Sequence, residues 1–131
     1  MDLKFHHIAI AVEDLEVTQN FYLKLGFKAS EPIVDENQDV KLVFLRKEHH
    51  PLLELVNPNS EGSPIINTLR KVGVSPYHIC YEVDDLQAAL EYFRANKFII
   101  TRRPTEAIAF GGRLIAFVYS QATGLIELLQ S

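Results

Sequence analysis

The sequence predicts an α+β fold built from two tandem βαβββ modules, and two repeated segments support this prediction. The segment HIAIAVEDL at 7–15 returns as HICYEVDDL at 78–86, an offset of 78 − 7 = 71. The segment LLELV at 52–56 returns as LIELL at 125–129, an offset of 125 − 52 = 73. The two extra residues fit an insertion in a loop. A chain of 131 residues is too short for two independent cores, so we expect a single domain over 1–131.

The first module, about residues 1–57, begins with a strand and a capped helix. FHHIAIAV at 5–12 alternates as a strand does, with His7 on one face and the branched apolar residues on the other. Asp14 is the expected N-cap of the next helix, and Gly26 ends it. Three further strands are expected at about 27–34, 40–46 and 52–56, with KEHHP as the hairpin tip between the last two.

A connector, about residues 58–76, separates the modules. Its ends are rich in turn formers, and SPIINTLRKVG within it is typical of a short helix. The second module, about residues 77–131, repeats the order of the first. It offers the strand YHICYEV, the capped helix DDLQAALEYFRAN, and three more strands, FIITRR, RLIAFVY and GLIELLQ.

The composition excludes several classes of function. A net charge of −4 gives no reason to expect nucleic acid, whose partners usually carry a basic face. No apolar run has the length needed to cross a bilayer, and MDLKFHH lacks the build of a signal peptide. The single cysteine, Cys80, cannot form an intrachain disulfide, which predicts a cytoplasmic protein.

Each module supplies one histidine at the start of its first strand and one glutamate inside its fourth: His7, Glu54, His78 and Glu127. Alone, such a glutamate is more often solvent-facing and such a histidine more often structural; the repeat favours a shared role. If the apolar faces meet the helices and the modules pair with pseudo-two-fold symmetry, all four side chains converge. Two imidazoles and two carboxylates suit one divalent ion, namely Mn, Co, Ni, Fe or Zn. We therefore expect a cupped mixed sheet around a metal-binding cavity.

Other polar residues have simpler interpretations. His6 falls on the face opposite His7 and is interpreted as structural, while His49 and His50 lie in a polar hairpin tip. Cys80 is interpreted as a small buried thiol. FGGR at 110–113 is typical of a turn, although its backbone N–H groups could hold an anion. Three arginines could neutralise an acidic substrate: Arg102, Arg103 and Arg113.

The segments HHIAIAVEDL, LLELVNP, YHICYEVDDL, FGGRLIAFV and LIELLQ resemble the vicinal oxygen chelate superfamily. That superfamily includes glyoxalase I, methylmalonyl-CoA epimerase, fosfomycin resistance proteins, extradiol dioxygenases and bleomycin-binding proteins. The resemblance covers essentially the whole chain and is nearest to the epimerase branch. It implies a homodimer and a metal that stabilises an enolate or related anion, held by the quartet His7, Glu54, His78 and Glu127.

One position departs from the epimerase branch. Epimerases of this kind can use two acid–base carboxylates, and the strand VKLVFL, which would carry one of them, has Leu42 at the matching position. Glu36 and Asp39 lie in the preceding loop, and Asp39 replaces a glycine usual in the branch. The resemblance therefore leaves two-base epimerisation in doubt and makes Glu127 the expected proton-transfer group as well as a ligand.

Three functions stay open from the sequence. The first is a metal-dependent isomerase or lyase that transfers a proton next to a carbonyl, epimerase-like on a small acyl-CoA such as methylmalonyl-CoA. The second is glyoxalase I (lactoylglutathione lyase), which has a similar quartet but acts on a glutathione hemithioacetal. The third is a non-catalytic drug or metabolite binding protein of the bleomycin resistance type. Such proteins generally lack the quartet, so its presence argues against this third function.

Overall fold

The computed structural model describes residues 1–131 and has the predicted mixed α+β composition, with three α-helices and nine β-strands. The chain forms two compact units: His7–Tyr77, and Met1–His6 together with His78–Ser131. The first strand, β1 (Lys4–Ala11), contributes residues to both units. None of the three helices has the length and apolar character required to span a membrane.

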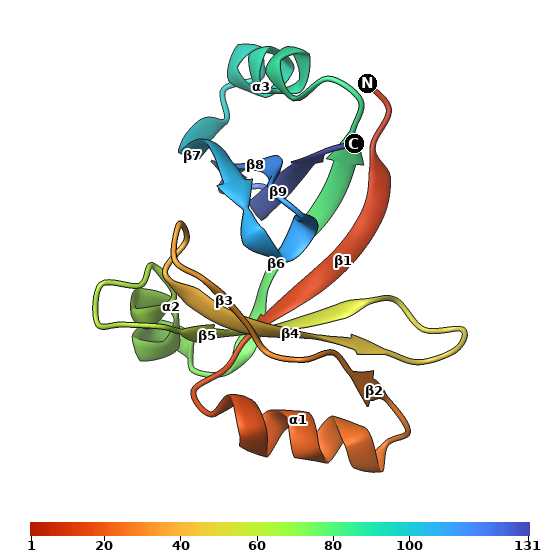
Figure 1. Cartoon of the computed structure of the whole chain (residues 1–131). Helices are drawn as coiled ribbons and strands as arrows, with labels where there is room; N and C mark the ends of the chain where they lie inside the picture. The colour runs from red at the N-terminus through yellow and green to blue at the C-terminus, as the bar shows by residue number, and fades with distance from the viewer. The chain divides into compact units, whose positions relative to one another are not determined.

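The unit His7–Tyr77 contains the expected elements of the first module and the connector helix. In chain order these are the end of β1, α1 (Leu15–Lys24), β2 (Lys28–Ala29), β3 (Ile33–Asp35), β4 (Val40–Arg46), β5 (Leu53–Pro58) and α2 (Ile65–Val72). Strand β5 pairs parallel with β1 and antiparallel with β4. Strands β2 and β3 both pair antiparallel with β4. Helix α1 lies along one face of this sheet (Figure 1).

Helix α1 begins where the sequence predicts. The Asp14 carboxylate accepts a hydrogen bond from the Val17 backbone N–H at 3.1 Å, which satisfies one of the N–H groups left open at a helix start. Gly26 follows the helix with φ of 94°, a conformation that glycine adopts without strain. Leu15 and Tyr22 of the helix pack against a cluster of buried side chains from the sheet, including Val12, Val43, Leu45, Leu53 and Leu55.

The expected single strand at 27–34 is wrong, because the structure has two short strands, β2 and β3, separated by Ser30–Pro32. Ser30 pairs with β4 partly through its side chain. Its N–H donates to the Phe44 carbonyl oxygen at 2.9 Å, and its hydroxyl oxygen accepts from the Phe44 N–H at 2.8 Å. Pro32 has no backbone N–H to continue the ladder. The strand is therefore interrupted at this point and resumes in β3.

The second unit repeats the arrangement of the first. Strand β6 (Ser75–Val83) enters it at His78, followed by α3 (Leu86–Ala95), β7 (Ile99–Ala107), a 3₁₀ turn (Ile108–Phe110), β8 (Arg113–Ser120) and β9 (Gly124–Gln130). Strand β9 pairs parallel with β6 and antiparallel with β8, and β8 pairs with β7. The Asp85 carboxylate caps α3 by accepting from the Ala88 N–H at 3.0 Å. Strand β7 extends beyond the expected end of FIITRR.

The predicted duplication is confirmed at the level of strand pairing. In each half the strand that carries the histidine runs parallel to, and next to, the strand that carries the glutamate. In each half the next neighbour of the glutamate strand is antiparallel and carries a phenylalanine opposite the glutamate, Phe44 for Glu54 and Phe117 for Glu127. The two halves therefore present the same side-chain pattern on equivalent strands.

Candidate functional site

The unit His7–Tyr77 holds one buried His–Glu pair. His7 on β1 is fully buried and Glu54 on β5 is 4% exposed. The His7 Nε2 atom lies 3.7 Å from Glu54 Oε1. Leu53 and Leu55, which flank Glu54, belong to the apolar cluster beneath α1. Because side chains alternate along a strand, Glu54 points to the face opposite α1. This is the face that the sequence predicts for both residues.

An aromatic ring packs against the histidine of this pair. Phe44 on β4 is the cross-strand partner of Glu54, and its ring centroid lies 6.0 Å from that of His7 at an interplanar angle of 75°. The edge-to-face arrangement is a favourable one for aromatic rings. Phe44 is only 6% exposed. The ring therefore shields the His–Glu pair from water on this side.

The second unit holds the equivalent pair. His78 on β6 is 6% exposed and Glu127 on β9 is 3% exposed. The His78 Nε2 atom lies 3.1 Å from Glu127 Oε2. Phe117 on β8 lies opposite Glu127, and its ring centroid is 5.1 Å from that of His78 at an angle of 76°.

The Glu127 carboxylate has a further contact that the sequence analysis missed. The Cys80 thiol donates to Glu127 Oε1 at 3.4 Å, so both carboxylate oxygens have a neighbour within the unit. Cys80 is fully buried, as expected of a small apolar-like thiol, but it also serves as a donor. Cys80 and Glu127 are direct partners in the parallel register of β6 and β9. No sequence signal identifies this contact, because it depends on that register.

The donor atoms of each pair suit a divalent cation. Every pair offers an imidazole nitrogen and a carboxylate oxygen, the mixed donor type that Mn, Co, Ni, Fe and Zn accept. Burial of an ionised carboxylate is costly unless a partner charge or a metal compensates for it. Both glutamates are nearly inaccessible to solvent. The residues present therefore fit a metal ion on chemical grounds.

Leu42, the residue that the resemblance matches to a second carboxylate of the epimerase branch, is also buried. It is 2% exposed and lies on β4 opposite Val56. Leu42 and Phe44 are two residues apart, so both side chains point to the face that carries Glu54. This face therefore carries an aliphatic side chain at Leu42.

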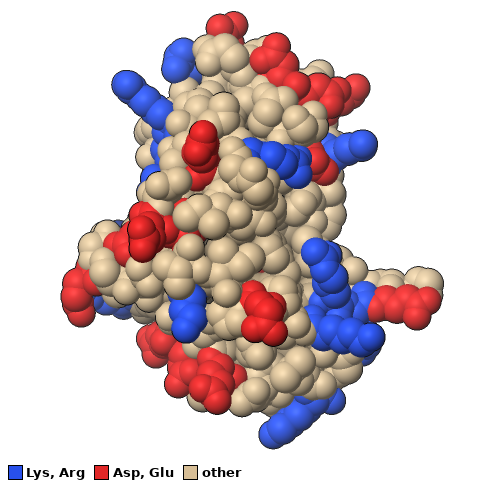
Figure 2. Space-filling view, viewed as in Figure 1, with Lys and Arg blue, Asp and Glu red and all other residues tan.

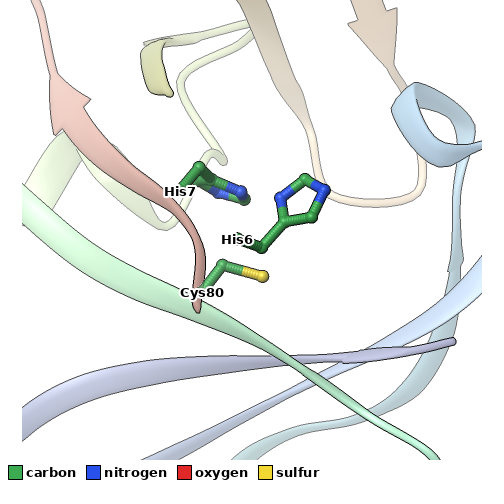
Figure 3. A group of neighbouring side chains, drawn as sticks. All are labelled: His6, His7 and Cys80. Atoms are coloured by element: carbon green, nitrogen blue, oxygen red, sulfur yellow. The ribbon is translucent and has the colours of Figure 1, made fainter. Parts of the chain in front are cut away.

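The remaining expected residues have structural contacts. His6 and His7 leave β1 at consecutive positions, and Cys80 leaves β6, as Figure 3 shows. The His6 ring packs edge-to-face on Phe110 at 5.2 Å. Arg113 donates from Nε to the Gln130 carbonyl oxygen at 2.8 Å and also pairs with Glu82. The glycines of FGGR have φ of 65° and 86°, which fits a turn.

The phenylalanines opposite the glutamates were also missed by the sequence analysis, although a signal for them exists. Phe44 and Phe117 differ by 117 − 44 = 73, the same offset as Glu54 and Glu127. Both phenylalanines stand inside strands that the sequence predicts. The repeat that relates the two glutamates therefore also relates the two phenylalanines.

A comparison with protein families matches residues 6–117 to the glyoxalase/bleomycin resistance protein/dioxygenase superfamily. Among curated relatives, the mitochondrial methylmalonyl-CoA epimerase of Dictyostelium discoideum is 33% identical over 129 residues, covering 95% of this chain and 76% of the relative. The ethylmalonyl-CoA/methylmalonyl-CoA epimerase of Cereibacter sphaeroides is 30% identical over 131 residues, covering 97% of each chain.

Solved structures show the same similarity. The methylmalonyl-CoA epimerase of Streptomyces coelicolor, in a variant complexed with 2-nitronate-propionyl-CoA, superposes with a TM-score of 0.84 at 27% identity. The match covers 99% of both chains. The fold predicted from the repeat is therefore the fold of this relative.

Proposed function

This chain belongs to the glyoxalase/bleomycin resistance/dioxygenase superfamily, and from that premise we propose that it is an isomerase that epimerises a small acyl-CoA such as methylmalonyl-CoA. The observation that carries the proposal is the buried His–Glu pair in each half. It is supported by epimerase relatives at 30–33% identity that match nearly the whole chain.

We propose that the two pairs together supply four ligands to one divalent ion: His7, Glu54, His78 and Glu127. The repeat-related positions, the burial of both glutamates and the donor atoms support this assignment. A bound divalent ion would lower the cost of the negative charge that develops next to a thioester carbonyl when its α-proton leaves. The identity of the metal is a matter for elemental analysis.

Glu127 is the residue that we propose to move the proton. A general base needs a carboxylate held in a fixed position within hydrogen-bond reach of the proton. Its two oxygens are held by the Cys80 thiol at 3.4 Å and by His78 at 3.1 Å. The ring of Phe117, which lies opposite Glu127 and packs on His78, limits access of water to the carboxylate.

Leu42 restricts how the reaction can proceed. Epimerisation requires a proton to leave one face of the α-carbon and another to arrive on the opposite face. Leu42 has no group that can give or take a proton. We therefore propose that Glu127 is the only protein carboxylate that exchanges the α-proton, and that inversion depends on a second donor or on rotation of the deprotonated substrate.

The test is an assay of wild-type protein purified without added metal, after elemental analysis and reloading with the metals found. Methylmalonyl-CoA in D₂O should incorporate deuterium at the α-carbon. The rate at which the α-carbon inverts should not exceed the rate at which its proton exchanges for deuterium. Turnover of a glutathione hemithioacetal alone would favour the glyoxalase I function instead. Absence of turnover on both substrates by metal-loaded protein would overturn the enzyme proposal in favour of a binding protein.

We also propose a cytoplasmic homodimer. The outer surface of α1 supports self-association, because Val17 is 65% exposed and Phe21 is 62% exposed on the same helix. Light scattering at tens of micromolar should give twice the mass of the chain. Phe21→Glu, which adds a charge to this surface, should yield monomers, and a monomeric wild-type protein would contradict the proposal.

A further inference from the structure

Basic side chains line a pocket at one end of the unit His7–Tyr77. The pocket has a volume of about 590 Å³ and is lined by Gly26, Lys28, Arg46, Lys47, Glu48, His50 and Leu52. Three of these residues are cationic and one is acidic. Figure 2 shows Lys and Arg side chains gathered near the base of the hairpin that joins β4 and β5. The lining therefore favours an anionic ligand.

The strand pairing gives the direction in which two of these cations point. Lys28 on β2 is the cross-strand partner of Arg46 on β4, so their side chains share a face. Leu45 and Ala29, the next residues, pack in the cluster beneath α1. Lys28 and Arg46 therefore point to the opposite face, which is the face of Glu54.

Arg46 also lies close to the His–Glu pair along the strand. It is two residues beyond Phe44, the cross-strand partner of Glu54. At about 3.4 Å per residue, this spacing is roughly 7 Å along β4. Arg46 and Glu54 therefore lie on the same face of the sheet, at neighbouring positions along it.

Lys47 is held in place at the mouth of the pocket. Its Nζ donates to the Leu25 carbonyl oxygen at 2.8 Å, at the end of α1, and lies 5.6 Å from the centroid of the Phe27 ring. The His50 ring packs edge-to-face on the same Phe27 ring, with the two centroids 4.8 Å apart. Contacts within the protein therefore fix Lys47 and His50 in the absence of a ligand. The Lys28 and Arg46 side chains have no such contact and can bind one.

We propose that this pocket binds the phosphate groups of the acyl-CoA substrate. The proposal rests on the proposed function, since it takes the thioester end of the substrate to lie at the glutamate face. An acyl-CoA carries its reacting carbonyl at one end and its phosphates at the other, with an extended arm between them. Arg46 can bind a phosphate in a bidentate manner, and Lys28 beside it adds a second positive charge.

The test compares methylmalonyl-CoA with methylmalonyl-pantetheine, which has the same reacting group but no phosphates. The double variant Lys28→Gln/Arg46→Gln should raise KM for the CoA thioester about tenfold or more, with kcat unchanged, because the lost contact is the same in the ground and transition states. KM for the pantetheine thioester should not change. Lys71→Gln, an exposed cation on α2, is the matched control and should leave both substrates unaffected.

A change of opposite sign sharpens the test. Glu48 is the only acidic residue of the lining, and its side chain is 89% exposed. Glu48→Gln should lower KM for the CoA thioester modestly, and rising salt should reduce the difference between variants. Equal changes of KM for both substrates, or no change for the CoA thioester in the double variant, would overturn the proposal.

Binding measurements separate this proposal from the function on which it rests. Calorimetry with free CoA should show weaker binding to the double variant than to wild type, even if neither thioester turns over. Calorimetry with inorganic pyrophosphate tests for a general small-anion site. Binding of pyrophosphate that is lost in the double variant, with CoA binding unchanged, would overturn the assignment to CoA. Circular dichroism of each variant checks that the fold is retained.

Discussion

The His7–Glu54 pair and the His78–Glu127 pair stand at equivalent positions of the two halves, but their immediate surroundings differ. The residue registered with Glu54 on the histidine strand is Ala9, whereas the residue registered with Glu127 is Cys80. An alanine methyl group cannot donate a hydrogen bond, while the Cys80 thiol donates to Glu127. The His–Glu distance is also longer in the first half, 3.7 Å against 3.1 Å.

This difference lets the proposal that the two glutamates have different roles be tested. Both halves keep the same donor atoms, which is what a shared metal requires. The second half adds a thiol donor, Cys80, to one oxygen of its carboxylate. Because the thiol holds one carboxylate oxygen in place, it supports the proton-transfer role proposed for Glu127.

The largest expected effect comes from exchanging each glutamate for its amide. Glu127→Gln should lower kcat by about 10²- to 10⁴-fold even with metal in excess, because a proton-transfer side chain typically contributes that much. Glu54→Gln should be milder, since the amide oxygen can still bind a cation. Both are measured on methylmalonyl-CoA after metal content has been checked. Equal, small losses in the two variants would contradict the role given to Glu127.

The next largest effect tests whether the two halves fold together. Phe44 and Phe117 are 6% and 7% exposed, and replacing a buried phenylalanine by alanine typically costs about 3–5 kcal/mol of the free energy of unfolding. Calorimetry should show one unfolding transition in wild type, displaced to lower temperature in both variants, as expected for the predicted single domain. Phe→Leu at the same positions is the control that should cost less. Two transitions, each sensitive to one variant only, would contradict the single domain.

A smaller effect is expected at Cys80. Cys80→Ala removes the donor to Glu127 Oε1, and a single hydrogen bond is worth about 0.5–1.5 kcal/mol, or roughly 2- to 10-fold in rate. The loss should fall on kcat rather than KM if the thiol positions the carboxylate. Cys80→Ser retains a donor and should recover most of the rate. Unchanged kcat in Cys80→Ala would show that the contact does not contribute to turnover.

The repeat made much of the fold predictable. Asp14 and Asp85 mark two helix starts, and alternation gives the faces of the first strand and of the strand that carries Glu127. These signals are local or repeated in the sequence, so they can be interpreted without knowing which strands pair. The buried pairs were predictable for the same reason, because each half repeats the same His and Glu.

The features that were not predictable depend on pairing between distant segments. The Cys80–Glu127 contact requires one register of β6 against β9, and a slip of one residue would turn one of the two side chains to the other face. The basic pocket requires β2 to pair with β4, which brings Lys28 next to Arg46. The break between β2 and β3 depends on side-chain hydrogen bonding by Ser30, which competes with a regular ladder.

The smallest expected effect concerns the two helices, which have equal caps but unequal packing. Helix α3 buries four residues, Leu86, Ala89, Leu90 and Phe93, whereas α1 has no fully buried residue. Asp14→Ala and Asp85→Ala each remove one cap acceptor and should each cost about 1 kcal/mol, with Asn at either position retaining most of the cap.

The unequal packing of the two helices should affect the rates of amide hydrogen exchange rather than the stability lost when a cap is removed. A helix with few buried contacts opens locally at lower free energy, so in the monomeric variant Phe21→Glu amides of α1 should exchange faster than those of α3. Because the cap loss acts on a helix that already opens locally, Asp14→Ala should accelerate exchange within α1 and leave α3 unchanged. Exchange measured by mass spectrometry on peptides covering each helix gives the comparison. Faster exchange in α3 than in α1 in the monomeric variant would contradict the prediction, whereas slower exchange of α1 in the dimeric wild type than in that variant would fit coverage of its outer surface by a partner chain.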